Sequence, residues 1–119
     1  MKTSVAPGEK FRDYIFRADA THGKDRVFRS LGYDVSNSED LARLFEQQAA
    51  IKFVQQDFTL GRLDEYGQRI NIEIKLDGIG DHMGQSSYLI SGWMIQRNGS
   101  ITLNTPFSGF ARKRDEMPC

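Results

Sequence analysis

The chain has 119 residues, of which 39% are hydrophobic and 27% are charged. This length fits one domain with a real core, and the composition argues against a disordered chain. Sixteen basic residues balance sixteen acidic ones, so no global positive field favours non-specific binding to nucleic acids. Any contact with RNA or DNA must come from a local patch, and only the stretch from Arg12 to Arg29 looks suited to one.

The single cysteine, Cys119, excludes an internal disulfide and a thiolate metal cluster. No apolar run approaches the length needed to cross a membrane, and the first residues lack the pattern of a secretory signal. We therefore expect a single domain over residues 1–119, in a reducing compartment and without contact with a membrane. Its ordered core is expected over about 8–110 and a flexible tail over 111–119.

Helices are predicted in the N-terminal half of the chain. Apolar residues at helical spacing predict a short helix over 11–18 and a second helix over 27–31 that ends at Gly32. Ser36 and Glu39 have the spacing of a capping box, which predicts a third helix whose apolar stripe runs to Ala49. The polar connection His22-Gly23-Lys24 lies between the first two predicted helices.

From Lys52 onward the pattern becomes that of strands. A first strand is predicted over 54–60, and a second over 70–76 alternates strictly between apolar and polar residues. The glycine-rich stretch over 77–86 predicts a mobile loop without a regular element. Asn98-Gly99, the preferred hairpin turn, joins a third strand over 87–96 to a last one over 101–105. The predicted fold class is α+β, with N-terminal helices packed on a four-stranded antiparallel sheet.

His22 and Lys24 are the first candidates for a functional site. They flank Gly23 at the predicted start of the second helix, where free backbone N–H groups favour an anion such as a phosphate. A histidine can move a proton near neutral pH, and a lysine can offset charge that builds on phosphorus. Together they suffice for metal-free cleavage of RNA by its own 2′-hydroxyl. On the spacing alone, an ordinary exposed histidine is the commoner explanation.

Other candidates lie on the predicted strands and turns. Tyr66 and Arg69 are at a predicted hairpin, where an aromatic ring and a guanidinium can stack on a base and bind a phosphate. Trp93 has apolar neighbours, so a core tryptophan is the commoner explanation. Thr102 and Thr105 could present hydroxyl groups to a phosphate, although threonine is also a favoured strand residue.

Asp77, Asp81 and His82 surround the glycine-rich loop and could be read as a metal site. Their spacing matches no EF-hand or zinc pattern. We therefore predict no metal and no cofactor.

The order of several short motifs is more specific than any one of them. These motifs are Phe11-Arg12-Asp13-Tyr14-Ile15-Phe16, His22-Gly23-Lys24, Val27-Phe28-Arg29-Ser30-Leu31-Gly32-Tyr33, Tyr66-Gly67, Trp93-Met94-Ile95 and Leu103-Asn104-Thr105. Over about residues 10–107 the chain resembles a small domain family of unknown function found in bacterial mobile elements and at the C-terminal ends of polymorphic toxins. That family is similar to the barnase/EndoU/colicin/RelE-like group of metal-independent RNases, in which N-terminal helices pack on a four-stranded antiparallel sheet.

The resemblance implies a bacterial toxin of the contact-dependent growth inhibition type, delivered as the C-terminal part of a larger secreted protein. It implies a ribonuclease that cleaves tRNA in the cytoplasm of the target cell, a cognate immunity protein, and a possible need for a host protein as cofactor. In this reading His22 is the acid or base, Lys24 and Thr105 act at the reacting phosphate, and the substrate contacts are Arg26, Tyr66, Arg69, Trp93 and Thr102.

This sequence departs from the family's usual form near His22. The family commonly has a proline after the histidine and paired glycines before the lysine, whereas Gly23 alone separates His22 from Lys24 here. Two alternatives to the toxin remain open. One is a non-catalytic protein-binding module encoded by a phage or genomic island, and the other is an immunity protein, whose surface would be more acidic than this balanced chain.

Overall fold

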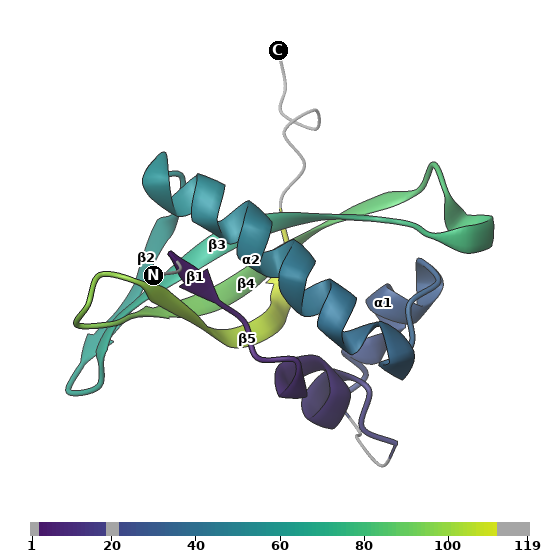
Figure 1. Ribbon diagram of the computed structural model, residues 1–119, viewed down its shortest axis with the longest axis horizontal. Helices are drawn as coiled ribbons and strands as arrows, with labels where there is room; N and C mark the ends of the chain where they lie inside the picture. The colour runs from purple at the N-terminus through teal and green to yellow at the C-terminus, as the bar shows by residue number, and fades with distance from the viewer. Residues whose placement is uncertain (1–2, 19–21, 112–119) are drawn as a thin grey trace.

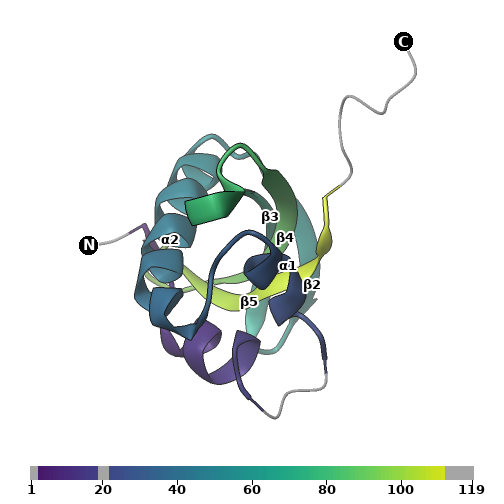
Figure 2. The ribbon, with the colours of Figure 1, turned by 90° about the vertical axis from the view of Figure 1, so that its right-hand side faces the viewer.

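The computed structural model describes residues 3–18 and 22–111, which form a five-stranded sheet with a long helix across one face (Figures 1 and 2). The order of strands in the sheet is β1-β5-β4-β3-β2. In chain order the elements are β1 (Ser4–Val5), the π-helix η1 (Lys10–Ile15), α1 (Asp25–Ser30), the 3-10 helix η2 (Val35–Asn37), α2 (Ser38–Val54), β2 (Thr59–Asp64), β3 (Gly67–Asp77), the 3-10 helix η3 (Gly80–His82), β4 (Ser86–Ile95) and β5 (Ile101–Phe110).

The predicted α+β class is confirmed, but the predicted four-stranded antiparallel sheet is wrong. The short strand β1 pairs with β5 in parallel, with Ser4 opposite Ile101. The Ser4 hydroxyl and the Ala6 N–H both donate hydrogen bonds to Glu46 of α2, at 2.6 and 2.7 Å. Two residues are too few to show the alternation by which a strand is recognised in a sequence.

Helix α2 differs from its prediction at both ends. The capping box lies between Asp34 and Asn37 instead of Ser36 and Glu39, and it opens η2, which leads into α2. At the other end, the helix continues to Val54, where a strand was predicted. Ile51 and Val54 are exposed by 60% and 73%, so these apolar residues do not mark the buried face of a strand.

The other predicted strands are closer to the structure. In β3 the apolar residues of the predicted alternation, Ile70, Ile72, Ile74 and Leu76, are all fully buried. Asn98 and Gly99 form the predicted turn between β4 and β5. The predicted end of the last strand at Thr105 is wrong, because β5 continues to Phe110. It passes through Pro106, which a strand with a free edge tolerates, and β1 pairs only with the first two residues of β5.

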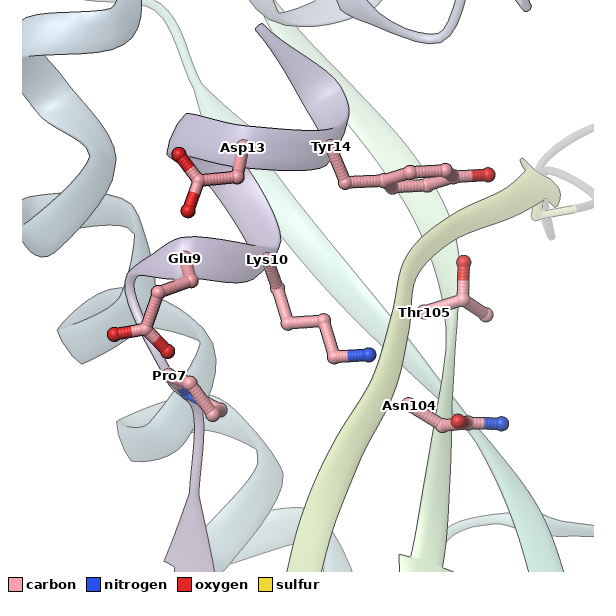
Figure 3. Close-up of a pocket in the computed structure, with 7 residues that line it drawn as sticks. All are labelled: Pro7, Glu9, Lys10, Asp13, Tyr14, Asn104 and Thr105. Carbon is pink, nitrogen blue, oxygen red and sulfur yellow. The ribbon is translucent and has the colours of Figure 1, made fainter. Parts of the chain in front are cut away.

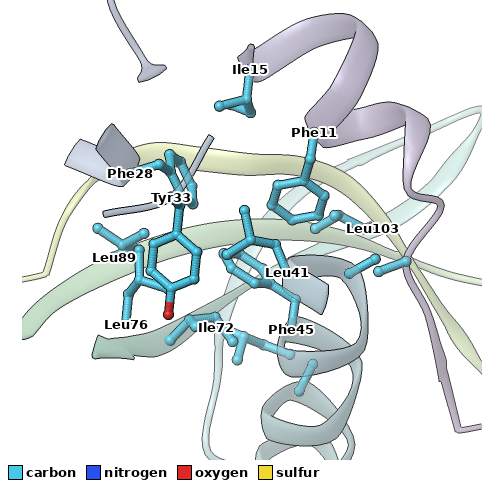
Figure 4. Packing of buried hydrophobic residues seen from close by; sticks show 14 of the residues in the cluster. Phe11, Ile15, Phe28, Tyr33, Leu41, Phe45, Ile72, Leu76, Leu89 and Leu103 are labelled. Atoms are coloured by element: carbon cyan, nitrogen blue, oxygen red, sulfur yellow. The ribbon is translucent and has the colours of Figure 1, made fainter. Parts of the chain in front are cut away.

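The core lies between α2, the N-terminal helical turns and the inner face of the sheet (Figure 4). Phe11 packs edge-to-face against Phe28 and Phe45, with ring centroids 6.0 and 5.0 Å apart. The predicted helix over 11–18 is the shorter π-helix η1, whose buried residues Phe11 and Ile15 face this core.

Two further predictions concern segments at the margins of the fold. The loop predicted to lack regular structure contains η3, and the Ile79 N–H binds the Leu31 carbonyl oxygen at 2.9 Å. Residues 112–119 of the predicted flexible tail lie outside the described residues. Among residues 3–18 and 22–111, no helix combines the length and the apolar character needed to cross a membrane.

Candidate functional site

Tyr14 of η1 holds the turn His22-Gly23-Lys24 in place. Its backbone oxygen accepts a hydrogen bond from His22 Nε2 at 2.9 Å, and its phenol oxygen accepts one from Lys24 Nζ at 3.0 Å. The centroids of the Tyr14 and His22 rings are 4.8 Å apart, and Lys24 Nζ lies 5.2 Å from the Tyr14 ring centroid. One tyrosine therefore positions both residues that the sequence suggested for chemistry.

Both ring nitrogens of His22 have hydrogen-bond partners. The Lys24 N–H donates to Nδ1 at 2.9 Å, which leaves the ring proton on Nε2, where it is donated to Tyr14. The prediction of free N–H groups at this helix start is thus wrong for Lys24, because its N–H donates to His22 Nδ1. Helix α1 has only 6 residues, so its dipole adds little. His22 can take up a proton at Nδ1 only after the Lys24 N–H has moved away.

A pocket of about 400 Å³ lies between η1 and β5 (Figure 3). We call it the first pocket, and its lining residues are Pro7, Glu9, Lys10, Asp13, Tyr14, Asn104 and Thr105. Lys10 and Tyr14 extend toward β5, whereas the carboxylates of Glu9 and Asp13 turn away from it (Figure 3). The pocket therefore joins Thr105 to the tyrosine that binds His22 and Lys24.

Two polar groups of the first pocket lack partners in the described part of the chain. The Thr105 hydroxyl oxygen is buried without a hydrogen bond. No hydrogen bond or ion pair within the described ranges engages the Lys10 ammonium. A buried hydroxyl without a partner costs about 1–3 kcal/mol, so a ligand that binds it recovers that cost. A hydroxyl and an ammonium facing one pocket suit an anionic oxygen, such as that of a phosphate.

The charges around this pocket are mixed: the carboxylates of Glu9 and Asp13 line it together with Lys10, and Arg12 lies 3.9 and 3.2 Å from those two carboxylates. The Asp25 carboxylate binds Arg29 at 2.7 Å, and this hydrogen bond lowers the pKa of Asp25 and balances its charge. The Arg26 guanidinium folds back over the neighbouring turn, with Nε 3.6 Å from where a Cβ of Gly23 would stand. Arg26 thus lies beside the His22 turn, as the sequence suggested, and adds to the charges of Lys10 and Lys24.

The remaining predicted site residues lie elsewhere. Tyr66 and Thr102 line a second pocket, of about 810 Å³, between the β2–β3 turn and the β4–β5 turn. Arg69 pairs with Met94 in the sheet, and its buried Nε has no hydrogen-bond partner in the described residues. Trp93 is fully buried, and its Nε1 donates to Ser91 Oγ at 2.8 Å. The Trp93 side chain therefore belongs to the core, which is the explanation that its apolar neighbours favoured, and its contact with substrate stays a prediction.

The loop with Asp77, Asp81 and His82 was considered as a metal site, and Asp77 makes other contacts there. Asp77 accepts a hydrogen bond from the Ser86 hydroxyl at 2.7 Å and lies 3.7 Å from the Lys75 ammonium. Within the described ranges, no group of three or more histidine, cysteine, aspartate or glutamate residues is placed to hold a metal ion.

Sequence reasoning missed Tyr14 and Lys10 as site residues. Tyr14 offered a signal, because it lies between the core residues Phe11 and Ile15 but is itself 39% exposed. A large aromatic side chain on the outer side of a short helical turn is a candidate for binding. No such signal marks Lys10, because a lysine next to an acidic residue is common on protein surfaces.

Comparison with known proteins shows the family to which the chain belongs. Residues 1–105 match the model of a family described as a domain of unknown function (DUF6883). No curated protein and no solved structure matches the chain. The matched residues include both His22 and Thr105, and they make up most of the 119 residues. The chain therefore belongs to the DUF6883 family of domains of unknown function.

Proposed function

We propose that this chain is a toxin domain that cleaves RNA without a metal ion, with the reaction taking place at the first pocket. One observation carries the proposal: His22 and Lys24 both bind Tyr14, and Tyr14 lines the first pocket together with Thr105. Of the three residues selected from the sequence for chemistry, Thr105 lines this pocket, and His22 and Lys24 are bound to a tyrosine that lines it. The cations Lys10, Lys24 and Arg26 supply the local patch that a chain of zero net charge needs in order to bind RNA.

The proposed reaction is an attack by the 2′-hydroxyl of RNA on the adjacent phosphate. A bond forms between the 2′-oxygen and phosphorus while the bond from phosphorus to the 5′-oxygen breaks. The products are a 2′,3′-cyclic phosphate and a free 5′-hydroxyl. Lys10 and the Thr105 hydroxyl bind a non-bridging oxygen of the phosphate, and Lys24 offsets the charge that builds there. No metal ion and no further reactant is needed.

His22 serves as the acid and base in this proposal. The entering phosphate draws the Lys24 side chain and backbone toward itself, which frees His22 Nδ1. Nδ1 then takes the proton of the 2′-hydroxyl and returns it to the departing 5′-oxygen, so that protons balance over the reaction. The hydrogen bond from Nε2 to the Tyr14 backbone oxygen holds the ring during both transfers.

The biological setting in this proposal is an attack on tRNA in the cytoplasm of a target bacterial cell. A cognate immunity protein protects the producing cell by covering the site. The first pocket lies at the surface between η1 and β5, where a bound protein can close it.

A second candidate function, a protein-binding module, is favoured by β2. This strand is the last in the sheet order, and its residues Leu60 and Leu63 are exposed by 72% and 73%. A free edge with exposed apolar side chains can pair with a strand of another protein. Such a module would have no ribonuclease activity.

Expression in a bacterial host separates the two functions. We expect the wild-type chain, expressed from a tightly controlled promoter, to stop growth and degrade tRNA, and His22→Ala to do neither. His82→Ala is the matched control, because His82 is the other of the 2 histidines, and this variant is expected to act like the wild type. Normal growth and intact RNA with the wild-type chain would rule out the ribonuclease.

A further inference from the structure

We propose that the second pocket binds a nucleobase of the same single-stranded RNA whose phosphate lies in the first pocket. This inference rests on the proposed function. The second pocket lies where the β2–β3 and β4–β5 turns meet, next to the start of β5. It shares no lining residue with the first pocket, so it is a separate site on the molecule.

A bulge in β5 brings the two pockets to one face of the sheet. Thr102 of the second pocket pairs with Met94, and Thr105 of the first pairs with Gly92. Met94 and Gly92 are two residues apart on β4 and therefore share a face. Thr102 and Thr105 are three residues apart and would face opposite ways in a regular strand. The register shift between Gly92 and Trp93 absorbs the extra residue, so both threonines lie on the face opposite the buried Trp93.

The open groups of the second pocket suit a nucleobase. Tyr66 is 74% exposed at the tip of the β2–β3 turn, which leaves its ring available for stacking. Arg97 has no ion pair or hydrogen bond within the described part of the chain. Its planar guanidinium can stack on a base or bind the adjoining phosphate. The Thr102 side chain adds a hydroxyl that can bind a base edge.

The acidic residues of this pocket favour a base over a bare phosphate. Asp64 is already engaged, since it accepts the Tyr66 N–H at 2.9 Å and lies 3.9 Å from Arg62. The Glu65 carboxylate also lines the pocket, and its negative charge repels a phosphate. The same carboxylate can accept a hydrogen bond from an amino group of a base.

The position of the second pocket favours RNA over a protein partner. Thr102 and Thr105 pair with Met94 and Gly92, which are two residues and so about 7 Å apart along β4, and a short oligonucleotide therefore reaches from one pocket to the other. Arg69 lies in the same cross-strand row as Thr102, because both pair with Met94.

Binding to RNA that cannot be cleaved tests the inference. The probe is a short fluorescein-labelled single-stranded oligonucleotide with 2′-O-methyl groups, which block the attacking hydroxyl, and the readout is fluorescence anisotropy. We expect Tyr66→Ala to weaken binding about tenfold, as the loss of one stacked base does, and Tyr66→Phe to bind like the wild type. Arg97→Ala should also weaken binding, while the matched control Tyr88→Ala should not.

The outcomes for the inference and for the proposed function are distinguishable. Equal affinity of the wild type, Tyr66→Ala and Arg97→Ala would overturn the inference, even if the wild type cleaves RNA, and would leave this pocket to a protein partner. Affinity that depends on Tyr66 in a chain that cleaves no RNA would support the pocket and contradict the ribonuclease. A wild-type chain that binds no oligonucleotide contradicts both.

Discussion

The position of Thr105 depends on the residue opposite it on β4. Gly92 pairs with Thr105, and a Cβ added at Gly92 would stand 2.9 Å from Thr105 Cγ2. Such a contact is too close, so one of the two residues would have to move. Glycine at position 92 therefore lets Thr105 hold its hydroxyl at the first pocket.

We predict that Gly92→Ala lowers the rate of RNA cleavage at least about tenfold by displacing the Thr105 hydroxyl. The double variant Gly92→Ala with Thr105→Ser should recover most of this loss, because serine keeps the hydroxyl and lacks the methyl group that clashes. Cleavage rates of purified variants with matched circular dichroism spectra provide the measurement. Wild-type activity in Gly92→Ala, or no rescue by the serine, would contradict this role of Gly92.

Tyr33 predicts a pH effect on stability. Burial raises the pKa of Tyr33, and its hydroxyl donates to the Asp77 carbonyl oxygen at 2.6 Å. Because the folded chain holds this proton more tightly than the unfolded chain, the contribution of Tyr33 is complete below the ordinary tyrosine pKa of about 10. It is lost as pH rises through the higher pKa of the folded state.

We expect the free energy of unfolding of Tyr33→Phe to be about 1 kcal/mol lower than that of the wild type near pH 8, because the variant lacks this hydrogen bond. This difference should shrink as pH rises beyond about 10, since only the wild type has the buried phenol to ionise. Urea unfolding across this pH range measures it, with Tyr88→Phe as a control at an exposed tyrosine. A difference that stays constant with pH would refute the assignment.

At the scale of the elements, β1 is attached to the molecule by its pairing with β5 and by its hydrogen bonds to Glu46 of α2. The Glu46 side chain is nearly buried, its Oε2 accepts the Ala6 N–H at 2.7 Å, and its Oε1 lies 3.4 Å from Arg43 Nε. Ala6 is fully buried, so its N–H has no access to water. A carboxylate on the inner side of α2 thus supplies an acceptor that the sheet does not.

We predict that Glu46→Ala lowers the free energy of unfolding by about 2 kcal/mol, the cost of an unpaired buried N–H together with the lost ion pair. Glu39→Ala is the matched control, because its side chain is 68% exposed and pairs with the same Arg43 at 3.9 Å. It should change stability by less than about 0.5 kcal/mol. Equal losses in the two variants would contradict a special role for Glu46.

Elements with strong local signals could be predicted from the sequence, and those held by tertiary contacts could not. The alternation in β3 and the Asn98-Gly99 turn were predicted because burial of one sheet face and hairpin geometry leave clear patterns. The strand β1 was missed because two residues show no alternation and because its partners, β5 and Glu46, are far away in the sequence. The end of α2 was misplaced because Ile51 and Val54 are apolar yet exposed.

The same distinction applies to the candidate site. His22 and Lys24 could be selected from the sequence because each carries recognisable chemistry near a glycine. Tyr14 could not be connected to them, since the link is a set of hydrogen bonds across a turn. Nor could the sequence place Thr105 beside Tyr14, because that neighbourhood depends on the bulge in β5 and on the packing of η1 against this strand.

At the scale of the whole molecule, a neutral chain can bind RNA only if its cations are gathered where they are needed. Lys10, Lys24 and Arg26 lie near Tyr14, beside the middle of β5, and Arg97 lies in the turn just before β5 begins. Such local charge makes binding sensitive to salt in proportion to the few phosphates contacted. The strand β5 contributes residues to both pockets, Thr105 to the first and Thr102 to the second.

The chemistry of the cleaved ends tests the central claim most directly. Purified protein is incubated with tRNA in the presence of EDTA, and the products are analysed by mass spectrometry. The account predicts 2′,3′-cyclic phosphate and 5′-hydroxyl ends from the wild type, and a loss of at least about a hundredfold in rate for His22→Ala but not for His82→Ala. Intact tRNA, ends of another kind, or equal rates for wild type and His22→Ala would contradict it.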